Sequence, residues 1–495
     1  MIPFLPVLPV VAQAAPISPA PEILPIEAPA SPTDLPKPTD LPKPSGVIEI
    51  PEDLDPKQIL QQQQVRPLPG QLDEIPVFNS NSPEVVLTEG ILLSTFSPEG
   101  KLFPQAHLNF AFKGRFDVFA HHISRARTPQ ELRSLVMGII MYNPGPESVT
   151  VEVLEAASYL TRPDALFVNL PPAIEDPLGR VYSGPGSRTM NDILRGRRQG
   201  NWPSTFEIPP GGYQMLMNLP LPAGLMLPTS NGRTTLIRLR SNGPVYLASM
   251  AMYAPKNETA EERLPTLEEW QNFLNTANLA GPRDLPPSPP DRKLTGPIIY
   301  GRVAGVAVGS EWKTWLTDKP IGEKLTIPQA GQAFSYALST VPRGTLGTNQ
   351  VQSARILARY ADTAYQANGN YGIQYSLTIP LYNPTSQPQS VTLMFQTPVK
   401  EDRIRGGLRF FDPPEPQVFF RGPVRFRYRD DQGVVQTQYF HLVQQRGQQG
   451  EPLLTLTLQP GERRLVQVDF LYPPDSTPPQ VLTIRTLDQV QNVSR

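Results

Sequence analysis

Short apolar segments separated by turn residues fill the sequence from residue 65 onward. The segment HLNFAFKGRFDVF, residues 107–119, is a clear example. Leu108, Phe110 and Phe112 lie at alternate positions in it. Side chains two residues apart lie on the same face of a strand, so this pattern predicts a strand with one apolar face. Many such segments between Gly, Pro and Asn turns indicate an all-β protein.

A β-hairpin is predicted near the C-terminal end. In the segment PVRFRYR, residues 423–429, Val424, Phe426 and Tyr428 alternate with arginines. The sequence DDQG then supplies a turn, and VVQTQYFHL supplies the returning strand. We expect the apolar set to face the core and the arginines to face solvent.

The chain contains an internal sequence repeat. Residues 139–153 (IIMYNPGPESVTVEV) and 379–394 (IPLYNPTSQPQSVTLM) each hold an apolar strand, Tyr-Asn-Pro, a polar turn and Ser-Val-Thr. Each is followed by a second matched segment with a Pro-Gly turn, at 208–222 and 458–473. The pattern predicts two copies of one β unit. By analogy, such a unit is similar to the immunoglobulin-like sandwiches of exported bacterial proteins.

One helix and one linker separate the two copies. Thr266 precedes Glu269 by three residues, which is a capping box and predicts a helix over 266–280. The Pro-rich segment 281–293 follows as a linker. The fold class is therefore all-β, with two immunoglobulin-like or β-sandwich-type domains, a short helix between them and a Pro-rich disordered N-terminus. The expected boundaries are 1–64 for the Pro-rich leader, 65–257 for the first domain, 258–293 for the helix and linker, and 294–495 for the second domain.

The N-terminal 64 residues have a different composition, with 15 prolines and one glycine. This composition favours polyproline II or disorder, and a spacer role is one interpretation. The first residues are apolar and end in Ala12-Gln13-Ala14, a small-residue cleavage pattern. The alternatives are a signal peptide over 1–14 whose true start lies upstream, and an apolar Pro-rich tail. We expect export to the periplasm, the cell envelope or the medium, and a cytoplasmic location is the alternative.

Composition argues against several classes of function. The 44 basic and 45 acidic residues give a net charge of −1, which argues against a nucleic-acid binder driven by global charge. The absence of cysteine removes disulfides, thiolate nucleophiles and cysteine-ligated metals. No stretch reaches 18 apolar residues, so no membrane-spanning helix is expected.

No catalytic motif is visible. The sequence contains no G-x-S-x-G, no phosphate-binding glycine loop and no H-E-x-x-H. His121 and His122 are adjacent and would face opposite sides of a strand, so neither they nor His107 and His441 predict a metal site. We expect no cofactor and no enzymatic activity. A pair of distant carboxylates suited to glycoside hydrolysis remains an alternative.

Two arginine clusters are the candidate binding residues. Guanidinium groups bind carboxylate, sulfate or phosphate with paired hydrogen bonds, and a solvated surface is the simpler interpretation. The clusters comprise Arg188, Arg195, Arg197 and Arg198 in a Gly-rich loop over 184–200, and Arg425, Arg427 and Arg429 on the hairpin. The partner strand of the hairpin offers Gln436, Thr437 and Gln438, and no acid is expected nearby. Trp202, Trp312 and Trp315 are candidates for stacking on sugar rings.

Several longer sequence segments resemble those of a known family. RPLPGQLDEIPVFNSNSPE at 66–84, GPGSRTMNDILRGRRQ at 184–199 and RYADTAYQANGNYG at 359–372 are examples. Over roughly residues 65–495, the chain resembles a cyanobacterial family catalogued only as a domain of unknown function. The resemblance implies a cyanobacterial origin and export. It implies no activity, ligand or site residue.

The leading hypothesis combines these observations. We expect a non-enzymatic exported or envelope-associated protein whose β surfaces present basic patches to an anionic envelope polysaccharide or to an envelope protein. The first alternative is an envelope glycan hydrolase with a carboxylate pair, and the second is a structural spacer without a ligand. The oligomeric state is left open.

Overall fold

Strands dominate the part of the chain that the structure describes. The computed structural model describes residues 57–126, 128, 133–165, 170–223, 229–290 and 296–488. Strands account for 48% and helices for 5% of the structure, so the predicted all-β class is confirmed. The predicted signal peptide at 1–14 and the Pro-rich segment up to residue 56 lie outside the described residues.

The elements before residue 280 include both α-helices and one short 3-10 helix, η1. They are β1 (Lys57–Gln62), β2 (Gln64–Arg66), β3 (Pro76–Ser80), β4 (Val85–Val86), β5 (Gly90–Ser94), η1 (Pro104–Ala106), β6 (Phe112–Ser124), β7 (Leu135–Tyr142), β8 (Val149–Thr161), β9 (Ala173–Glu175), α1 (Ser187–Leu194), β10 (Thr205–Ile208), β11 (Tyr213–Leu221), β12 (Asn231–Tyr253) and α2 (Leu267–Thr276).

The elements after residue 300 are all strands. They are β13 (Ala304–Val308), β14 (Glu311–Trp315), β15 (Leu325–Thr326), β16 (Ala333–Leu338), β17 (Ala354–Arg359), β18 (Gln366–Ala367), β19 (Gln374–Tyr382), β20 (Gln389–Gln396), β21 (Gly407–Asp412), β22 (Glu415–Arg429), β23 (Val435–Arg446), β24 (Leu454–Leu458), β25 (Arg463–Leu471) and β26 (Gln480–Thr486).

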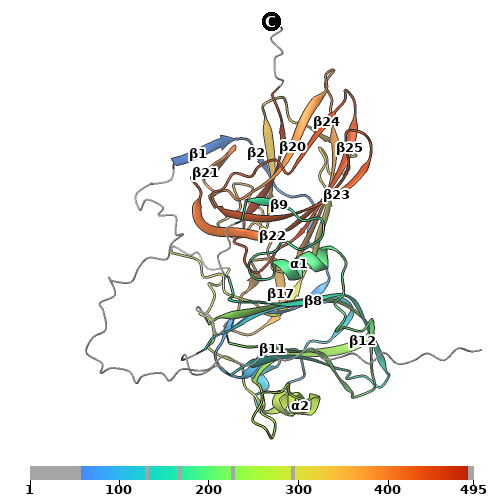
Figure 1. Ribbon diagram of the computed structural model, residues 1–495, viewed down its shortest axis with the longest axis vertical. Helices are drawn as coiled ribbons and strands as arrows, with labels where there is room; N and C mark the ends of the chain where they lie inside the picture. The colour runs from blue at the N-terminus through green and yellow to red at the C-terminus, as the bar shows by residue number, and fades with distance from the viewer. Residues whose placement is uncertain are drawn as a thin grey trace, which may run out of the picture. The chain divides into compact units, whose positions relative to one another are not determined.

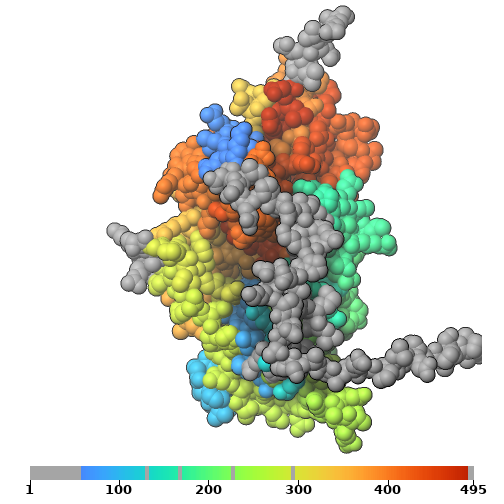
Figure 2. Space-filling model, turned by 60° about the vertical axis from the view of Figure 1, so that its left-hand side comes forward, coloured from blue at the N-terminus to red at the C-terminus, as the bar shows by residue number. Residues whose placement is uncertain are grey.

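Strand pairing begins at Lys57, within the segment 1–64 predicted as a Pro-rich leader. β1 pairs with β21 in antiparallel register, and β2 pairs with β16 in parallel register. Figure 2 shows the blue residues of β1 against orange residues of the second half. Residues 57–66 hold no proline, so their backbone amides can donate to a neighbouring strand, which explains why pairing begins after Pro56.

In the first half, the long strand β12 is shared by two groups of strands. Its first part pairs with β6 and β8, and its last part pairs with β5 and β7. Alternate residues of these strands point into one apolar core. The strand predicted over 107–119 begins only at Phe112, because Asn109 has a φ of 50° that interrupts extended backbone. The apolar contacts are as predicted, since Phe112 and Phe116 are fully buried and Leu108 and Phe110 pack against this core.

The second half contains a five-stranded and a seven-stranded sheet. The five-stranded sheet has the order β2-β16-β26-β20-β24, and the seven-stranded sheet has the order β14-β19-β25-β22-β23-β9 with β15 beside β19. Side chains from both sheets pack in one core, where the ring centroids of Phe395 and Phe470 lie 5.4 Å apart. The predicted hairpin is confirmed, with Arg429 opposite Val435.

The internal sequence repeat has a counterpart in the pairing of the strands. β7, β8, β10 and β11 pair with one another as β19, β20, β24 and β25 do. In addition, β12 pairs with β8 as β26 pairs with β20. The two halves therefore repeat one arrangement of strands.

The asparagine of each Asn-Pro turn joins that turn to the Pro-Gly turn. Asn143 Nδ2 donates to the carbonyls of Glu147 and Ile208 at 2.7 and 3.0 Å. Asn383 Nδ2 makes the equivalent bonds to the carbonyls of Gln387 and Leu458, at 2.8 and 3.0 Å. Both asparagines are fully buried. The side chain therefore satisfies backbone acceptors that no strand reaches.

The predicted capping box starts α2. Thr266 Oγ1 accepts from the amide of Glu269 at 3.2 Å, and the Glu269 carboxylate accepts from the amide of Thr266 at 2.7 Å. The helix packs Trp270 and Leu274 against β7 and β12. Gly138 on β7 permits this approach, because a Cβ there would lie 2.5 Å from the Trp270 ring. The helix ends at Thr276, four residues before the predicted end.

Helix α1 was not predicted, and it replaces the expected loop over 184–200. It contacts β8 and β12 of the first half and β22 and β25 of the second half (Figure 1). Met190, Ile193 and Leu194 bury their side chains there. Its N-cap is Gly186 at φ 75°, without a side-chain cap, so the sequence lacks the usual start signal of a helix.

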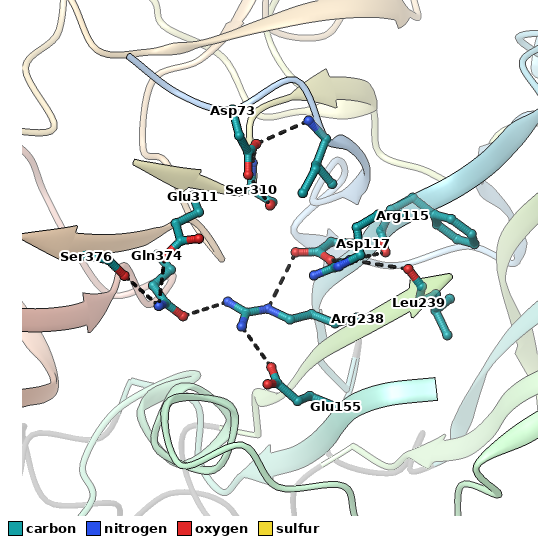
Figure 3. A network of polar contacts seen from close by, with 12 residues as sticks. Asp73, Arg115, Asp117, Glu155, Arg238, Leu239, Ser310, Glu311, Gln374 and Ser376 are labelled. Atoms are coloured by element: carbon teal, nitrogen blue, oxygen red, sulfur yellow. Dashed lines mark hydrogen bonds and ion pairs between the residues drawn. The ribbon is translucent and has the colours of Figure 1, made fainter. Parts of the chain in front are cut away.

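A polar network joins the two halves (Figure 3). Arg238 on β12 pairs with Glu155 at 2.8 Å and donates to Gln374 Oε1 of β19 at 2.8 Å. Arg238 also lies 3.8 Å from the carboxylate of Asp117, which Arg115 contacts as well. β3 and β13 also pair, so both halves share one sheet. The predicted domain boundaries stay a prediction.

The described part of the predicted linker is anchored by side chains. Arg283 bonds the Asp362 carboxylate with two hydrogen bonds of 2.7 and 2.9 Å, and Asp284 accepts from Ser82 Oγ at 2.5 Å. In the ranges that the structure describes, no helix is long and apolar enough to cross a membrane.

Candidate functional site

The first arginine cluster is bonded to its own chain. The Arg195 guanidinium donates to the carbonyls of Asp176 and Pro177 at 2.5 and 3.0 Å and lies 3.7 Å from the Tyr439 ring centroid. These contacts join the C-terminal end of α1 to β23 and to the segment after β9. Arg195 is therefore half-buried and fixes α1 in place.

The other three arginines of this cluster are more exposed. Arg188 lies over the ring of Tyr159 at 4.0 Å, Arg197 pairs with Asp192 at 2.9 Å, and Arg198 donates to the Val153 carbonyl at 3.0 Å. The four guanidinium groups have separate partners within the chain. Their predicted role in anion binding stays a prediction.

The hairpin arginines lie on the outer face of the seven-stranded sheet, but only Arg427 and Arg429 reach solvent as predicted, because the Arg425 side chain is 16% exposed and bonded to α1. The expectation that no acid lies nearby is wrong. Asp469 of β25 is 3% exposed and pairs with Arg425 at 3.1 Å and with Arg427 at 3.2 Å. Sequence reasoning considered only the hairpin partner β23, whereas β22 also pairs with β25. Arg425 is therefore a structural residue as well, since it compensates a buried carboxylate.

The outer face of this sheet has a covered end. Arg425 donates to the Leu194 carbonyl of α1 at 2.8 Å, and Gln374 accepts from Arg238 of β12 at 2.8 Å. Tyr439 lies under Arg195. Segments of the first half therefore close over this end, next to the network of Figure 3.

The other end of the same face is open, and we call it the open sheet face. Register aligns one row of side chains across five strands. Residues directly opposite one another on neighbouring strands point to the same side of a sheet. The row consists of Trp315 (β14), Thr378 (β19), Gln467 (β25), Arg427 (β22) and Thr437 (β23).

A second row lies two residues farther along these strands. Pro380 is opposite Leu465, and Arg429 is opposite Val435. Arg463 lies two residues before Leu465, on the same face of β25. Trp315 is 54% exposed and Leu465 is 46% exposed, which is unusual for large apolar side chains in such proximity.

Shallow hollows run along the open sheet face. One of about 660 Å³ is lined by Arg427, Arg429 and Arg463, and one of about 590 Å³ is lined by Trp315 and Pro380. They share Arg463 and Leu465, so they are continuous. A polar hollow of about 240 Å³ extends from Arg427 toward the covered end. The face can therefore take an elongated ligand.

The strands of the outer face carry more basic than acidic side chains. The basic ones are Lys313, Arg425, Arg427, Arg429 and Arg463, and the acidic ones are Glu311 and Asp469. The rim of the hollows adds Arg464 and the carboxylates Glu323, Asp430, Asp431 and Glu462, so the arginines of the strands lie beside a rim that is mostly acidic. Arg463 pairs with Glu323 at 3.3 Å, but that carboxylate is 85% exposed, so the pair is weak in water.

Among the tryptophans proposed for sugar stacking, only Trp315 is accessible. Trp202 and Trp312 are 3% and 4% exposed and belong to the apolar cores. Sequence reasoning missed Leu465 and Gln467 of the open sheet face. The alternation of RRLVQVDFL, residues 463–471, was the signal that could have placed them on one face.

The four histidines are buried and bonded to hydroxyl groups. The partners of His107, His121, His122 and His441 are Ser94, Thr234, Ser80 and Ser183, at 2.8 to 2.9 Å. Within the described residues, no group of three or more His, Cys, Asp or Glu side chains could hold a metal ion. The histidines act as hydrogen-bonding groups of the core.

Comparison with known proteins shows the family of this chain, and the similar solved structures share little of its sequence. A family described as "Protein of unknown function (DUF3370)" matches residues 63–486. No curated protein matches the sequence. Among solved structures, Lac15 from a marine microbial metagenome is 11% identical over 73% of this chain, with a TM-score of 0.09. The chain spans half the length of Lac15.

Two further structures have the same low similarity. A mutant of the Bacillus subtilis oxalate decarboxylase OxdC is 11% identical, and the coconut allergen cocosin is 8% identical. The matches cover 80% and 77% of this chain, and 77% and 84% of theirs. Their TM-scores are 0.09 and 0.10.

Proposed function

Because the chain belongs to the DUF3370 family, a family of proteins of unknown function, we propose its function from the open sheet face. It is a non-enzymatic protein, exported or associated with the cell envelope, that binds an anionic envelope polysaccharide on this face. The observation that carries the proposal is the presence of an exposed Trp315 on the same open face as Arg427, Arg429 and Arg463.

These residue types suit an acidic sugar polymer. The exposed indole of Trp315 offers a flat apolar surface to the face of a sugar ring. The guanidinium groups of Arg427, Arg429 and Arg463 can donate paired hydrogen bonds to carboxylate or sulfate groups. Gln467 and Thr437 add donors and acceptors for hydroxyl groups between them.

The length of the face also favours a polymer. Trp315 and Thr437 lie on strands separated by four steps across the sheet. At about 4.8 Å for each step, the row spans about 19 Å. A chain of several sugar units would lie across the strands, with the arginines beside it.

The proposed location rests on the N-terminal sequence. An exported protein of cyanobacterial origin would use the Pro-rich segment as a spacer between its anchor point and the sheet face. Fractionation of cells into cytosol, periplasm, membranes and medium tests this part. Recovery of the protein in the cytosol, with Met1 retained, would rule out export.

Replacing arginines of the open sheet face is expected to weaken polymer binding without unfolding the protein. The double variant Arg429→Ala/Arg463→Ala should bind a polyuronate at least about tenfold more weakly in titration calorimetry. Both side chains are exposed, so the melting temperature should not change. Wild-type binding should weaken as salt increases.

The matched control is Arg240→Ala/Arg355→Ala, which removes two exposed arginines of other strands. This control should bind the polyuronate as the wild type does. Equal losses in both double variants would show binding by net charge alone and contradict the proposed site. Release of shortened chains would support the hydrolase alternative, and no binding to any envelope polymer would support the spacer.

A further inference from the structure

A cavity of about 460 Å³ lies apart from the open sheet face, because the two have no lining residue in common. Segments far apart in the sequence form its wall. Asn79 and Asn81 come from β3 and the turn after it, Tyr371 from the loop before β19, Lys400 from the loop before β21, and Ser476 from the loop before β26. The volume fits one or two sugar rings.

Three buried polar atoms of this wall have no hydrogen-bond partner among the residues that the structure describes. They are Oδ1 of Asn79, Oδ1 of Asn81 and Oγ of Ser476. The three side chains are only 5%, 4% and 3% exposed. Buried polar groups are nearly always bonded, and leaving one unpaired costs stability. All three residues line one cavity, so a ligand that reached these atoms when the side chains turn toward it would supply the missing bonds.

The charged side chains of the cavity compensate one another. Arg302 contacts the carboxylates of Glu84 and Asp284, the second at 3.3 Å. Lys400 Nζ donates to Tyr300 Oη at 2.6 Å, and burial lowers the pKa of Lys400 to about 8. Two acidic and two basic groups leave no net charge for a charged ligand to match.

The carboxylates are not available for other chemistry. Glu84 and Asp284 share one guanidinium, so a cation between them would meet the positive charge of Arg302. The Asp284 carboxylate also accepts from Ser82 Oγ at 2.5 Å. This arrangement disfavours a metal ion, and it leaves neither carboxylate free to act as a nucleophile.

We propose that this cavity binds a small neutral polyhydroxylated molecule, a monosaccharide or a disaccharide. Its hydroxyl groups would donate to Asn79 and Asn81, and its ring would lie against the Tyr300 and Tyr371 side chains. Hydroxyl groups are both donors and acceptors, so one ligand can also bond Ser476 and Lys400. The proposal concerns a second site and does not depend on polymer binding at the open sheet face.

Saturation-transfer NMR and calorimetry with single sugars test the proposal. The neutral probes are glucose, galactose, mannose, N-acetylglucosamine, sucrose and trehalose, and the charged probes are glucuronate and glucosamine. At least one neutral sugar should bind at millimolar concentration or below, more tightly than the charged ones. The variants Asn79→Leu and Asn81→Leu should each weaken this binding at least about tenfold.

A second readout separates a ligand site from a structural role. Because the two amide oxygens have no partner among the described residues, the ligand-free leucine variants should melt at the same temperature as the wild type or higher. The control Asn201→Leu, at an exposed turn, should leave sugar binding unchanged. Polyuronate binding should also be unchanged in the cavity variants.

Three results would overturn the proposal. They are no binding of any neutral sugar, binding that the asparagine variants do not weaken, and a melting temperature lowered by several degrees in both leucine variants. The last result would mean that Asn79 and Asn81 serve the fold instead of a ligand.

Discussion

Lowering the pH from 7 to 5 is expected to reduce the free energy of unfolding. Burial lowers the pKa of His107 and His441 to about 4 and the pKa of His121 and His122 to about 3. In the unfolded chain these groups titrate near pH 6.5. The unfolded chain therefore gains protons between pH 6.5 and 4 that the folded protein does not bind.

The sign and size of this change in the free energy of unfolding follow from proton linkage. A pKa lowered on folding gives stability that is present above pH 6.5 and is lost as the pH falls toward the folded value. His121, His122 and His441 each contribute a loss of about 2 kcal/mol between pH 7 and 5, and His107 contributes less because solvent screens it more. Asp117, Asp164 and Asp475 act in the opposite direction, because burial raises their pKa values, that of Asp164 to about 7. Asp164 alone offsets about 2 kcal/mol of the loss.

Urea unfolding followed by fluorescence at pH 7, 6 and 5 measures this effect. The matched variant is His107→Gln, since His107 bonds one hydroxyl group, that of Ser94 at 2.8 Å. Its stability should depend less steeply on pH than that of the wild type, by about one histidine's share. A stability that is flat between pH 7 and 5 would contradict the burial of the four histidines.

Replacing either repeated asparagine is expected to destabilise the protein by about 3 kcal/mol. Asn143→Leu removes bonds from Nδ2 to the carbonyls of Glu147, Ile208 and Pro209 and the bond from the Gly145 amide to Oδ1. Asn383→Leu removes bonds from Nδ2 to the carbonyls of Gln387 and Leu458 and the bonds from the Thr385 amide and hydroxyl to Oδ1. Each variant leaves backbone groups unpaired between two turns.

The two losses should agree within about 1 kcal/mol, because each asparagine side chain makes four hydrogen bonds within its Asn-Pro turn and to the Pro-Gly turn. Thr385→Ala is the comparison variant, since it keeps the asparagine and its bonds to the two carbonyls and removes only the hydroxyl group that donates to Asn383 Oδ1 and to the Gln387 carbonyl, so its loss should be smaller. Thermal or urea unfolding of the three variants gives the comparison. A large loss at one asparagine and none at the other would argue against the structural equivalence of the halves.

Local sequence signals predicted much of this fold. The alternation around Phe112, the hairpin at Arg429, the capping box at Thr266 and the Asn-Pro repeat all describe contacts between residues close in sequence or copied in it. Helix α1 was not predicted, because its N-cap Gly186 has no side chain that would mark the start of a helix. Strands β1 and β2 were not predicted, because their partners β21 and β16 lie hundreds of residues away in the sequence.

The candidate site was only half predictable for the same reason. Alternation placed Arg427 and Arg429 on the outer face of a strand, which the structure confirms. It could not place Asp469 beside Arg427, because β25 joins β22 through a pairing that the hairpin does not reveal. It also could not show that α1 covers one end of the face and leaves Trp315 open.

The most direct measurement of the proposed function is quenching of tryptophan fluorescence by acrylamide, with and without an acidic polysaccharide. Trp315 is 54% exposed, whereas Trp202, Trp270 and Trp312 are at most 4% exposed, so quenching reports Trp315. If the polymer binds the open sheet face, it should shield Trp315 and reduce quenching, and Arg429→Ala/Arg463→Ala should remove this protection. Unchanged quenching under conditions where the polymer is bound would show that it lies elsewhere and would contradict the account.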